Sequence, residues 1–122
     1  MRISYGKNVY GTEEINSVVK TLKKSTQMGI NVNDFEKKIA DIFAKKYGLM
    51  VNSGSSALIL ALKVLNLPQK SEVITPCLNF GTALSSIVLT GLKPILVDCE
   101  KDTLQIDISQ IKKKLQRILK LY

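Results

Sequence analysis

The sequence predicts an α/β protein: a parallel sheet with helices on both faces, in three αβα layers, preceded by two amphipathic helices. The main observation is that apolar stretches of strand length and of helix length alternate between residues 49 and 114. Such alternation is typical of βαβ units with right-handed crossovers. Before residue 49, apolar residues recur at helical spacing instead. With 122 residues, 45% of them apolar, the chain has the size of one domain with a core.

The first helix is expected over residues 12–24. Thr12 can cap it, because a threonine hydroxyl can accept a hydrogen bond from an unpaired N–H of the first turn. Glu13 and Glu14 lie in that turn, where the helix dipole favours negative charge. Its apolar stripe consists of Ile15, Val18, Val19 and Leu22.

The second helix is expected over residues 34–47, because Asn33 and Asp34 are typical of a helix start and Gly48 is typical of a helix end. We expect its apolar face to be buried. That face consists of Phe35, Ile39, Ile42 and Phe43.

The following residues predict the order βαβαβα as far as residue 114. The expected strands are residues 49–51, 72–75 and 94–98, and the expected helices include residues 57–65 and 80–89. The helix over residues 57–65 is apolar almost all round, so we expect it to lie buried against the sheet. Pro76 and Gly91 are expected to end the element before each of them.

The net charge of +8 comes largely from lysines in pairs and triplets on what we expect to be the outer faces of helices. We therefore assign these lysines to solvated surface and expect no nucleic-acid partner. The alternative is a polyanion site. Cys77 and Cys99 lack C-x-x-C spacing and the chain has no histidine, which argues against a metal site and against thiol catalysis.

The sequence contains no apolar stretch near the roughly 18 residues that a membrane span needs. Its first residues also lack the apolar run of a signal peptide. We therefore expect a cytoplasmic protein with no membrane partner.

The first candidate site is the turn before the apolar helix, at Gly54, Ser55 and Ser56. The amino end of a helix offers unpaired N–H groups and partial positive charge to an anion. Gly54 would let a phosphate approach the backbone closely, and the two serines can add hydroxyl donors. The alternative is that the serines only cap the helix.

The second candidate site is the turn after the strand at residues 72–75, where Phe80 follows Asn79. Loops at the carboxyl ends of neighbouring parallel strands face the same crevice. Phe80 could therefore lie on the face of a flat ligand ring. The alternative is that Phe80 belongs to the core.

Five sequence blocks, in order, resemble the DegT/DnrJ/StrS family of sugar aminotransferases, which are fold type I pyridoxal-phosphate enzymes. Residues 52–58 (NSGSSAL) resemble the family turn N-S-G-T/S-A/S-A-L. The other blocks are similar to G-x-x-V-x-x-F-E at residues 29–36, E-V-I-x-P at 72–76, G-x-x-P-x-F-V-D at 91–98 and D-T-L-N-I-D at 102–107. Together they cover most of residues 5–114.

The resemblance implies that the chain is part of the large cofactor-binding domain of such an enzyme. The backbone of Ser55 and Ser56, beside Gly54, would hold the phosphate of pyridoxal 5′-phosphate, and Phe80 would stack on its pyridine ring. Asn79 stands where the family usually has threonine. Met28 and Gly29 would border the sugar-nucleotide site. The implied partners are a nucleotide-linked keto sugar, an amino-acid donor and a second subunit in a homodimer.

Two residues that the family requires have no counterpart in this sequence. They are the aspartate that pairs with the pyridine nitrogen and the lysine that forms the Schiff base with the cofactor, so the resemblance supplies no catalytic residue here. We therefore expect an amino-terminal fragment that is inactive alone. The expected function of the parent is amino transfer in lipopolysaccharide or surface-polysaccharide synthesis. The alternatives are a pyridoxamine-phosphate-dependent sugar 3-dehydrase and a non-catalytic binding remnant.

Residues 115–122 (LQRILKLY) depart from the family, which continues with a segment similar to I-T-P-K-T-K-A-I. If these residues are written in A/T-rich codons, moving the frame back by one base yields Ile-Thr-Lys-Asn-Thr-Lys-Ala-Leu. We therefore expect a one-base slip in the adenine run that encodes residues 112–114. The alternative is a naturally short chain whose last helix spans residues 108–121.

Overall fold

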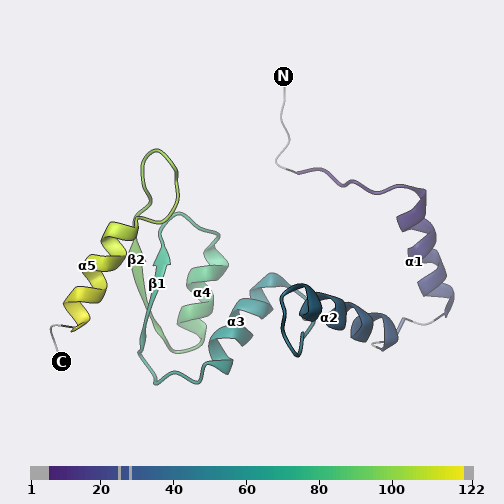
Figure 1. Ribbon diagram of the computed structural model, residues 1–122, viewed down its shortest axis with the longest axis horizontal. Coiled ribbons are helices and arrows are strands. Elements are labelled where there is room, and N and C mark those ends of the chain that lie inside the picture. The colour runs from purple at the N-terminus through teal and green to yellow at the C-terminus, as the bar shows by residue number, and fades with distance from the viewer. Residues whose placement is uncertain (1–5, 25, 28, 120–122) are drawn as a thin grey trace. The chain divides into compact units, whose positions relative to one another are not determined.

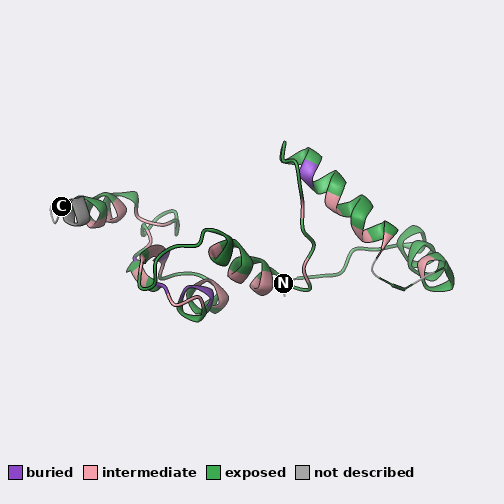
Figure 2. Ribbon diagram, turned by 90° about the horizontal axis from the view of Figure 1, so that it is seen from below, coloured by how far each residue is buried: buried purple, intermediate pink, exposed green. Residues whose placement is uncertain are grey.

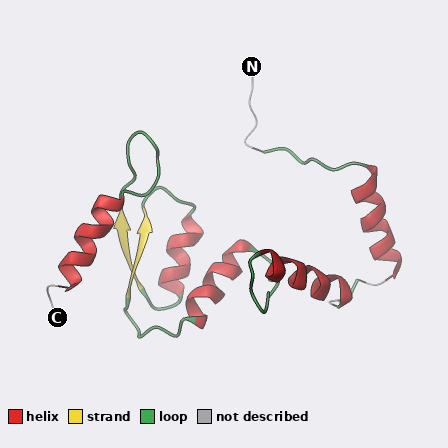
Figure 3. Cartoon of the chain, viewed as in Figure 1, coloured by secondary structure: helices red, strands yellow, loops and turns green. Residues whose placement is uncertain are grey.

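The computed structural model describes residues 6–24, 26–27 and 29–119. It contains five helices and two strands within these residues (Figures 1 and 3). In chain order they are α1 (Thr12–Lys24), α2 (Ile30–Ile42), α3 (Gly54–Val64), β1 (Glu72–Pro76), α4 (Gly81–Leu89), β2 (Lys93–Val97) and α5 (Ile108–Leu119). The chain divides into two compact units between Met50 and Val51.

Helix α1 has the predicted bounds, but its cap differs from the prediction. The Gly11 carbonyl accepts the first helical hydrogen bond, from Ile15 N–H at 3.3 Å. Gly11 N–H donates to Glu14 Oε2 at 2.7 Å, which is half of a capping box. Gly11 therefore occupies the cap position, and Thr12 is the first helical residue.

Helix α2 begins and ends earlier than the predicted residues 34–47. Its end is a Schellman motif: Ala44 N–H donates to Asp41 O at 3.0 Å, and Lys45 N–H donates to Ala40 O at 2.8 Å. Ala44 takes the left-handed conformation, with φ of 50°, that glycine usually supplies at this position. The prediction that Gly48 ends the helix was wrong, because these hydrogen bonds end α2 several residues before Gly48.

The apolar faces of the first unit are exposed (Figure 2). Ala40 is the one buried residue among those described in α1 and α2. The predicted buried face of α2 is mostly open to solvent, as Phe43 and Ile42 show with 67% and 74% exposure. That part of the prediction was wrong, since no described segment of the first unit covers this face.

The second unit contains a βαβ motif. Strands β1 and β2 pair in parallel, with Glu72 opposite Lys93 and Pro76 opposite Val97, and α4 connects them (Figure 1). Lys93 Nζ also lies 2.7 Å from Glu72 Oε1. The predicted α/β class and parallel pairing are confirmed. The small core of this unit contains Thr75, Ser86, Ile87, Leu92 and Val97.

Helix α4 ends as predicted at Gly91. This residue has φ of +77°, and its N–H donates to Val88 O at 3.0 Å, while Leu92 N–H donates to Ile87 O at 3.1 Å. The two hydrogen bonds form a second Schellman motif. Glycine is favoured here because other residues rarely adopt a positive φ.

Two predictions for the chain on either side of the division at Met50 and Val51 were wrong. Residues 49–51 do not form a strand, because no described backbone pairs with them. Helix α3 begins at Gly54 rather than Ala57, and none of its residues is buried. It packs beside α4 instead of against the sheet. The described part of the chain has no helix with the length and apolar character to cross a lipid bilayer.

Candidate functional site

The first turn of α3 is held by Ser53. This residue has extended φ and ψ of −161° and 159° and occupies the cap position. Its Oγ accepts a hydrogen bond from Ser56 N–H at 3.2 Å, and its carbonyl accepts one from Ala57 N–H at 3.1 Å. A serine of this turn does cap the helix, as the alternative prediction had it, but the capping residue is Ser53 rather than Ser55 or Ser56.

The Ser56 hydroxyl donates one hydrogen bond and accepts another beside the same turn. It donates to Asn52 Oδ1 at 2.7 Å and accepts from Ser53 Oγ at 3.1 Å. Asn52 and Ser53 were not among the predicted site residues. Their signal was the spacing of three and four residues to Ser56, which places short polar side chains beside the first helical turn.

Gly54 and Ser55 leave the turn open to a ligand. Among the described residues, neither of their N–H groups has a hydrogen-bond partner, as expected at the first two positions of a helix. A Cβ built on Gly54 would meet no atom within 4 Å, and its φ is not in the left-handed region. Neither crowding nor backbone conformation therefore requires glycine here, whereas the close approach of an anion would.

A hollow of about 370 Å³ lies beside this turn. Asn52 and Ser56 form its polar wall, and Val51, Ile59 and Leu60 form its apolar wall. The Ser56 and Asn52 side chains, which are hydrogen-bonded to each other at the start of α3, therefore also line the hollow.

Phe80 directly precedes α4, near the carboxyl end of β1. Its side chain is 75% exposed, so the alternative of a core residue was wrong. Its N–H donates to Asn79 Oδ1 at 2.7 Å, so the asparagine that replaces the family threonine orients the phenylalanine backbone. Phe80 and the first turn of α3 belong to the same unit, in which α3 and α4 lie side by side.

The two other predicted site residues belong to the first unit or lie outside the description. Met28 lies outside the described residues. Gly29 is the cap residue of α2, with extended φ of −177°, and its carbonyl accepts a hydrogen bond from Asn33 N–H at 3.0 Å.

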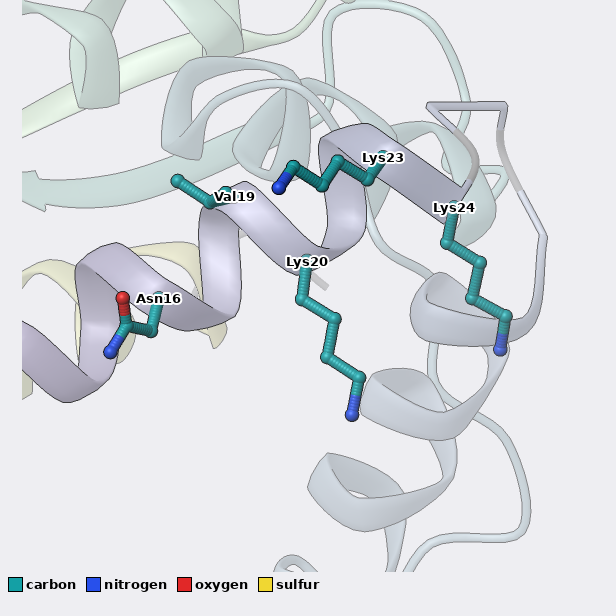
Figure 4. Close-up of a pocket in the computed structure, with 5 residues that line it drawn as sticks. All are labelled: Asn16, Val19, Lys20, Lys23 and Lys24. Atoms are coloured by element: carbon teal, nitrogen blue, oxygen red, sulfur yellow. The ribbon is translucent and has the colours of Figure 1, made fainter.

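A basic hollow of about 450 Å³ lies along α1 (Figure 4). Asn16, Val19, Lys20, Lys23 and Lys24 line it. In Figure 4 the Lys23 side chain points away from those of Lys20 and Lys24, and the three ammonium groups do not converge on one point. A single helix face with diverging lysines is typical of solvated surface.

Two carboxyl groups outside these sites have lowered pKa values. The pKa of Glu14 is lowered, first by the hydrogen bond from Gly11 N–H. The pKa of Asp107 is lowered, first by the hydrogen bond from the Ser109 side chain. No group of three or more His, Cys, Asp or Glu residues in the described ranges could hold a metal ion.

The chain is similar to known proteins over almost its whole length. A model of the DegT/DnrJ/EryC1/StrS aminotransferase family matches residues 9–120, and thus extends into the terminal segment expected to depart from the family. The spore coat polysaccharide biosynthesis protein SpsC of Bacillus subtilis (strain 168) is 37% identical over 106 residues, which are 86% of this chain and 27% of SpsC. The GDP-4-keto-6-deoxy-D-mannose 3-dehydratase of Yersinia pseudotuberculosis is 31% identical over 112 residues, which are 86% of this chain and 28% of that protein.

A solved structure is similar to this chain over almost the same residues. The PLP form of the putative sugar aminotransferase Spr1654 from Streptococcus pneumoniae matches with a TM-score of 0.81 and 27% identity. The match covers 93% of this chain and 29% of that structure. The chain therefore spans between a quarter and a third of the length of these relatives.

Proposed function

Because the chain belongs to the DegT/DnrJ/EryC1/StrS aminotransferase family, we propose that it forms the phosphate-binding part of a pyridoxal-phosphate-dependent sugar aminotransferase. In the complete enzyme an amino acid would donate an amino group, and a nucleotide-linked keto sugar of surface-polysaccharide synthesis would receive it. The names of SpsC and of Spr1654 support this assignment. Pyridoxal phosphate, when bound, supplies the electron sink that amino transfer needs.

The observation that carries the proposal is the open first turn of α3. The phosphate would be held by the backbone of Gly54, Ser55 and Ser56, where the helix dipole and the unpaired N–H groups of Gly54 and Ser55 favour negative charge. The absence of protein atoms around the Cβ position of Gly54 fits this role. Phe80, which is exposed near the end of β1, would cover one face of the pyridine ring.

The finer assignments are also proposals. Met28 and Gly29 would border the site of the sugar nucleotide, and the complete enzyme would be a homodimer. We further propose that residues 1–122 are inactive alone, because none of their lysines corresponds to the family lysine that binds the cofactor covalently.

Titration with pyridoxamine 5′-phosphate and with pyridoxamine tests the phosphate site. The chain has no tryptophan, so the fluorescence of the ligand ring can be followed directly. We expect tighter binding of the phosphorylated ligand, and inorganic phosphate should compete with it. Equal affinity for the two ligands would refute the proposed phosphate site.

Reaction with pyridoxal 5′-phosphate followed by borohydride reduction tests the proposed inactivity. We expect scattered, substoichiometric labelling of surface lysines. Stoichiometric labelling of one lysine, mapped by mass spectrometry, would show that this chain contains a cofactor lysine after all.

A second candidate function is supported by the similarity to the 3-dehydratase of Yersinia pseudotuberculosis. In that case the parent would remove a sugar hydroxyl instead of adding an amino group. The resemblance distinguishes the two by the residue at the cofactor-lysine position, which is histidine in the dehydrase branch. Sequencing the DNA beyond residue 122 in all frames would identify that residue.

A further inference from the structure

We propose that Asn52 is a positioning residue of the phosphate turn, which acts by holding the Ser56 hydroxyl. The inference rests on the proposed function, because it concerns the same phosphate site. It assigns different roles to two adjacent serines: Ser55 faces the ligand with its hydroxyl, and the Ser56 hydroxyl is an internal brace.

The hydrogen bonds of Ser56 carry the first step. A serine hydroxyl has one hydrogen to donate. In Ser56 this hydrogen is directed to Asn52 Oδ1 at 2.7 Å, and the oxygen accepts from Ser53 Oγ at 3.1 Å. A phosphate needs donors, so the Ser56 hydroxyl contributes none while Asn52 holds it.

The contrast with the preceding residue carries the second step. Among the described residues, Ser55 has no hydrogen-bond partner for its hydroxyl or its N–H. It follows Gly54, around which a Cβ would meet no protein atom. The open side of the turn is therefore at Gly54 and Ser55, and the braced side is at Ser56.

The hydrogen bond between Asn52 and Ser56 would hold the turn in shape. Asn52 precedes the cap residue Ser53, so its bond to Ser56 joins the chain before the helix to the first turn of α3. Together with the bond from Ser56 N–H to Ser53 Oγ, it determines the direction of the N–H groups of that turn. A phosphate that binds preformed N–H groups loses less ordering entropy than one that must organise them.

The experiment compares Asn52→Ala, Ser56→Ala and their double variant in the full chain, at low protein concentration. The probes are pyridoxamine 5′-phosphate and pyridoxamine, whose affinity ratio isolates the contribution of the phosphate. We expect each single variant to lower this ratio about fivefold, roughly the worth of one neutral hydrogen bond. The double variant should lose no more than either single variant, because both remove the same interaction.

Ser56→Thr tests rescue, since it restores a hydroxyl at this position and should recover most of the affinity ratio that Ser56→Ala loses. Circular dichroism of each sample checks that the helices are retained. An unchanged ratio in Asn52→Ala, or additive losses in the double variant, would overturn the role of Asn52 while leaving the phosphate site intact. Equal binding of the two probes by the original chain would overturn both proposals.

Discussion

Glu36 and Met50 are 14 residues apart, yet Glu36 Oε1 accepts a hydrogen bond from Met50 N–H at 2.7 Å. The close approach continues at Gly48, where a Cβ would lie 2.7 Å from the Glu36 carbonyl oxygen. The side chain and backbone of one helical residue thus hold the returning segment against α2. This contact gives a structural reason for Glu36, the last residue of the block at residues 29–36 that resembles the family.

Gly48→Ala should destabilise the first unit. The added methyl group would meet the backbone of Glu36, which cannot move aside as a flexible side chain can. We expect a loss of about 1–3 kcal/mol, measured by urea denaturation. Gly29→Ala is the matched control, because its Cβ would meet nothing closer than 3.7 Å, and its stability should be nearly unchanged. An unaltered midpoint for Gly48→Ala would contradict the close approach.

Gly54→Ala should weaken phosphate binding without weakening the fold. Its Cβ meets no protein atom, and alanine favours the helix, so stability should rise by about 0.4–1 kcal/mol. The same methyl group would obstruct a phosphate, so the affinity ratio of pyridoxamine 5′-phosphate to pyridoxamine should fall.

The control for that prediction is Gly81→Ala, which lies at the first position of α4 and also has open space around its Cβ. It should leave the affinity ratio unchanged. If both alanine variants bind the phosphorylated ligand as the original chain does, the close approach at Gly54 is refuted.

Gly91 and Ala44 occupy equivalent positions in the two Schellman motifs. Replacing Gly91 by alanine and Ala44 by glycine should therefore change stability in opposite directions. Gly91→Ala places a side chain at φ of +77° and against the Gln69 side chain, so we expect a loss of at least about 1–2 kcal/mol. Ala44→Gly relieves the left-handed strain at φ of 50° and should stabilise α2 by about 1 kcal/mol. Thermal denaturation measures both stabilities. A change of the melting temperature in the same direction for both variants would contradict the equivalence of the two positions.

The start of α5 should loosen in acid. Asp107 Oδ1 accepts from Ser109 N–H at 2.8 Å and from Ser109 Oγ at 2.6 Å, and the Ser109 side chain is the first cause of its lowered pKa. A lowered folded-state pKa means that this contribution is present above the ordinary carboxyl pKa, about 3.9, and is lost as pH falls through the folded value.

Amide hydrogen exchange of Ser109 and Gln110 measures that loss. Protection should fall below about pH 4 in the original chain. Asp107→Asn keeps a side-chain oxygen acceptor but cannot titrate, so its protection should not change over the same range. Equal protection of the original chain at pH 2 and pH 6 would contradict the role of the carboxylate.

Exposed apolar faces should make the isolated chain self-associate. The α1 face is largely open in the structure, with Val18 58% and Leu22 63% exposed. Large contiguous apolar surfaces favour association. We expect sedimentation velocity to show species that grow with protein concentration and a broad thermal transition. A soluble monomer with a cooperative melt would contradict this expectation.

Local sequence signals predicted those features that depend on neighbouring residues. The stripe and bounds of α1, the end of α4 at Gly91 and the parallel pairing of two strands are confirmed, and the strands predicted at residues 72–75 and 94–98 differ from the observed ones by one residue at an end. The serine-rich turn was correctly placed at the amino end of this helix, although α3 begins within the turn, at Gly54, rather than at Ala57. These features follow from periodicity, backbone conformation and capping, which act over a few residues.

The sequence by itself determined the α/β class, the family blocks and the candidate turn at Gly54, Ser55 and Ser56. Only the tertiary structure decided that residues 49–51 pair with no strand in the described ranges, that α2 ends before Ala44 and that Asn52 and Ser53 bind Ser56. The physical reason is that a strand or a buried face requires a partner from elsewhere in the chain, and a side-chain brace requires a direction in space. Composition and periodicity specify neither.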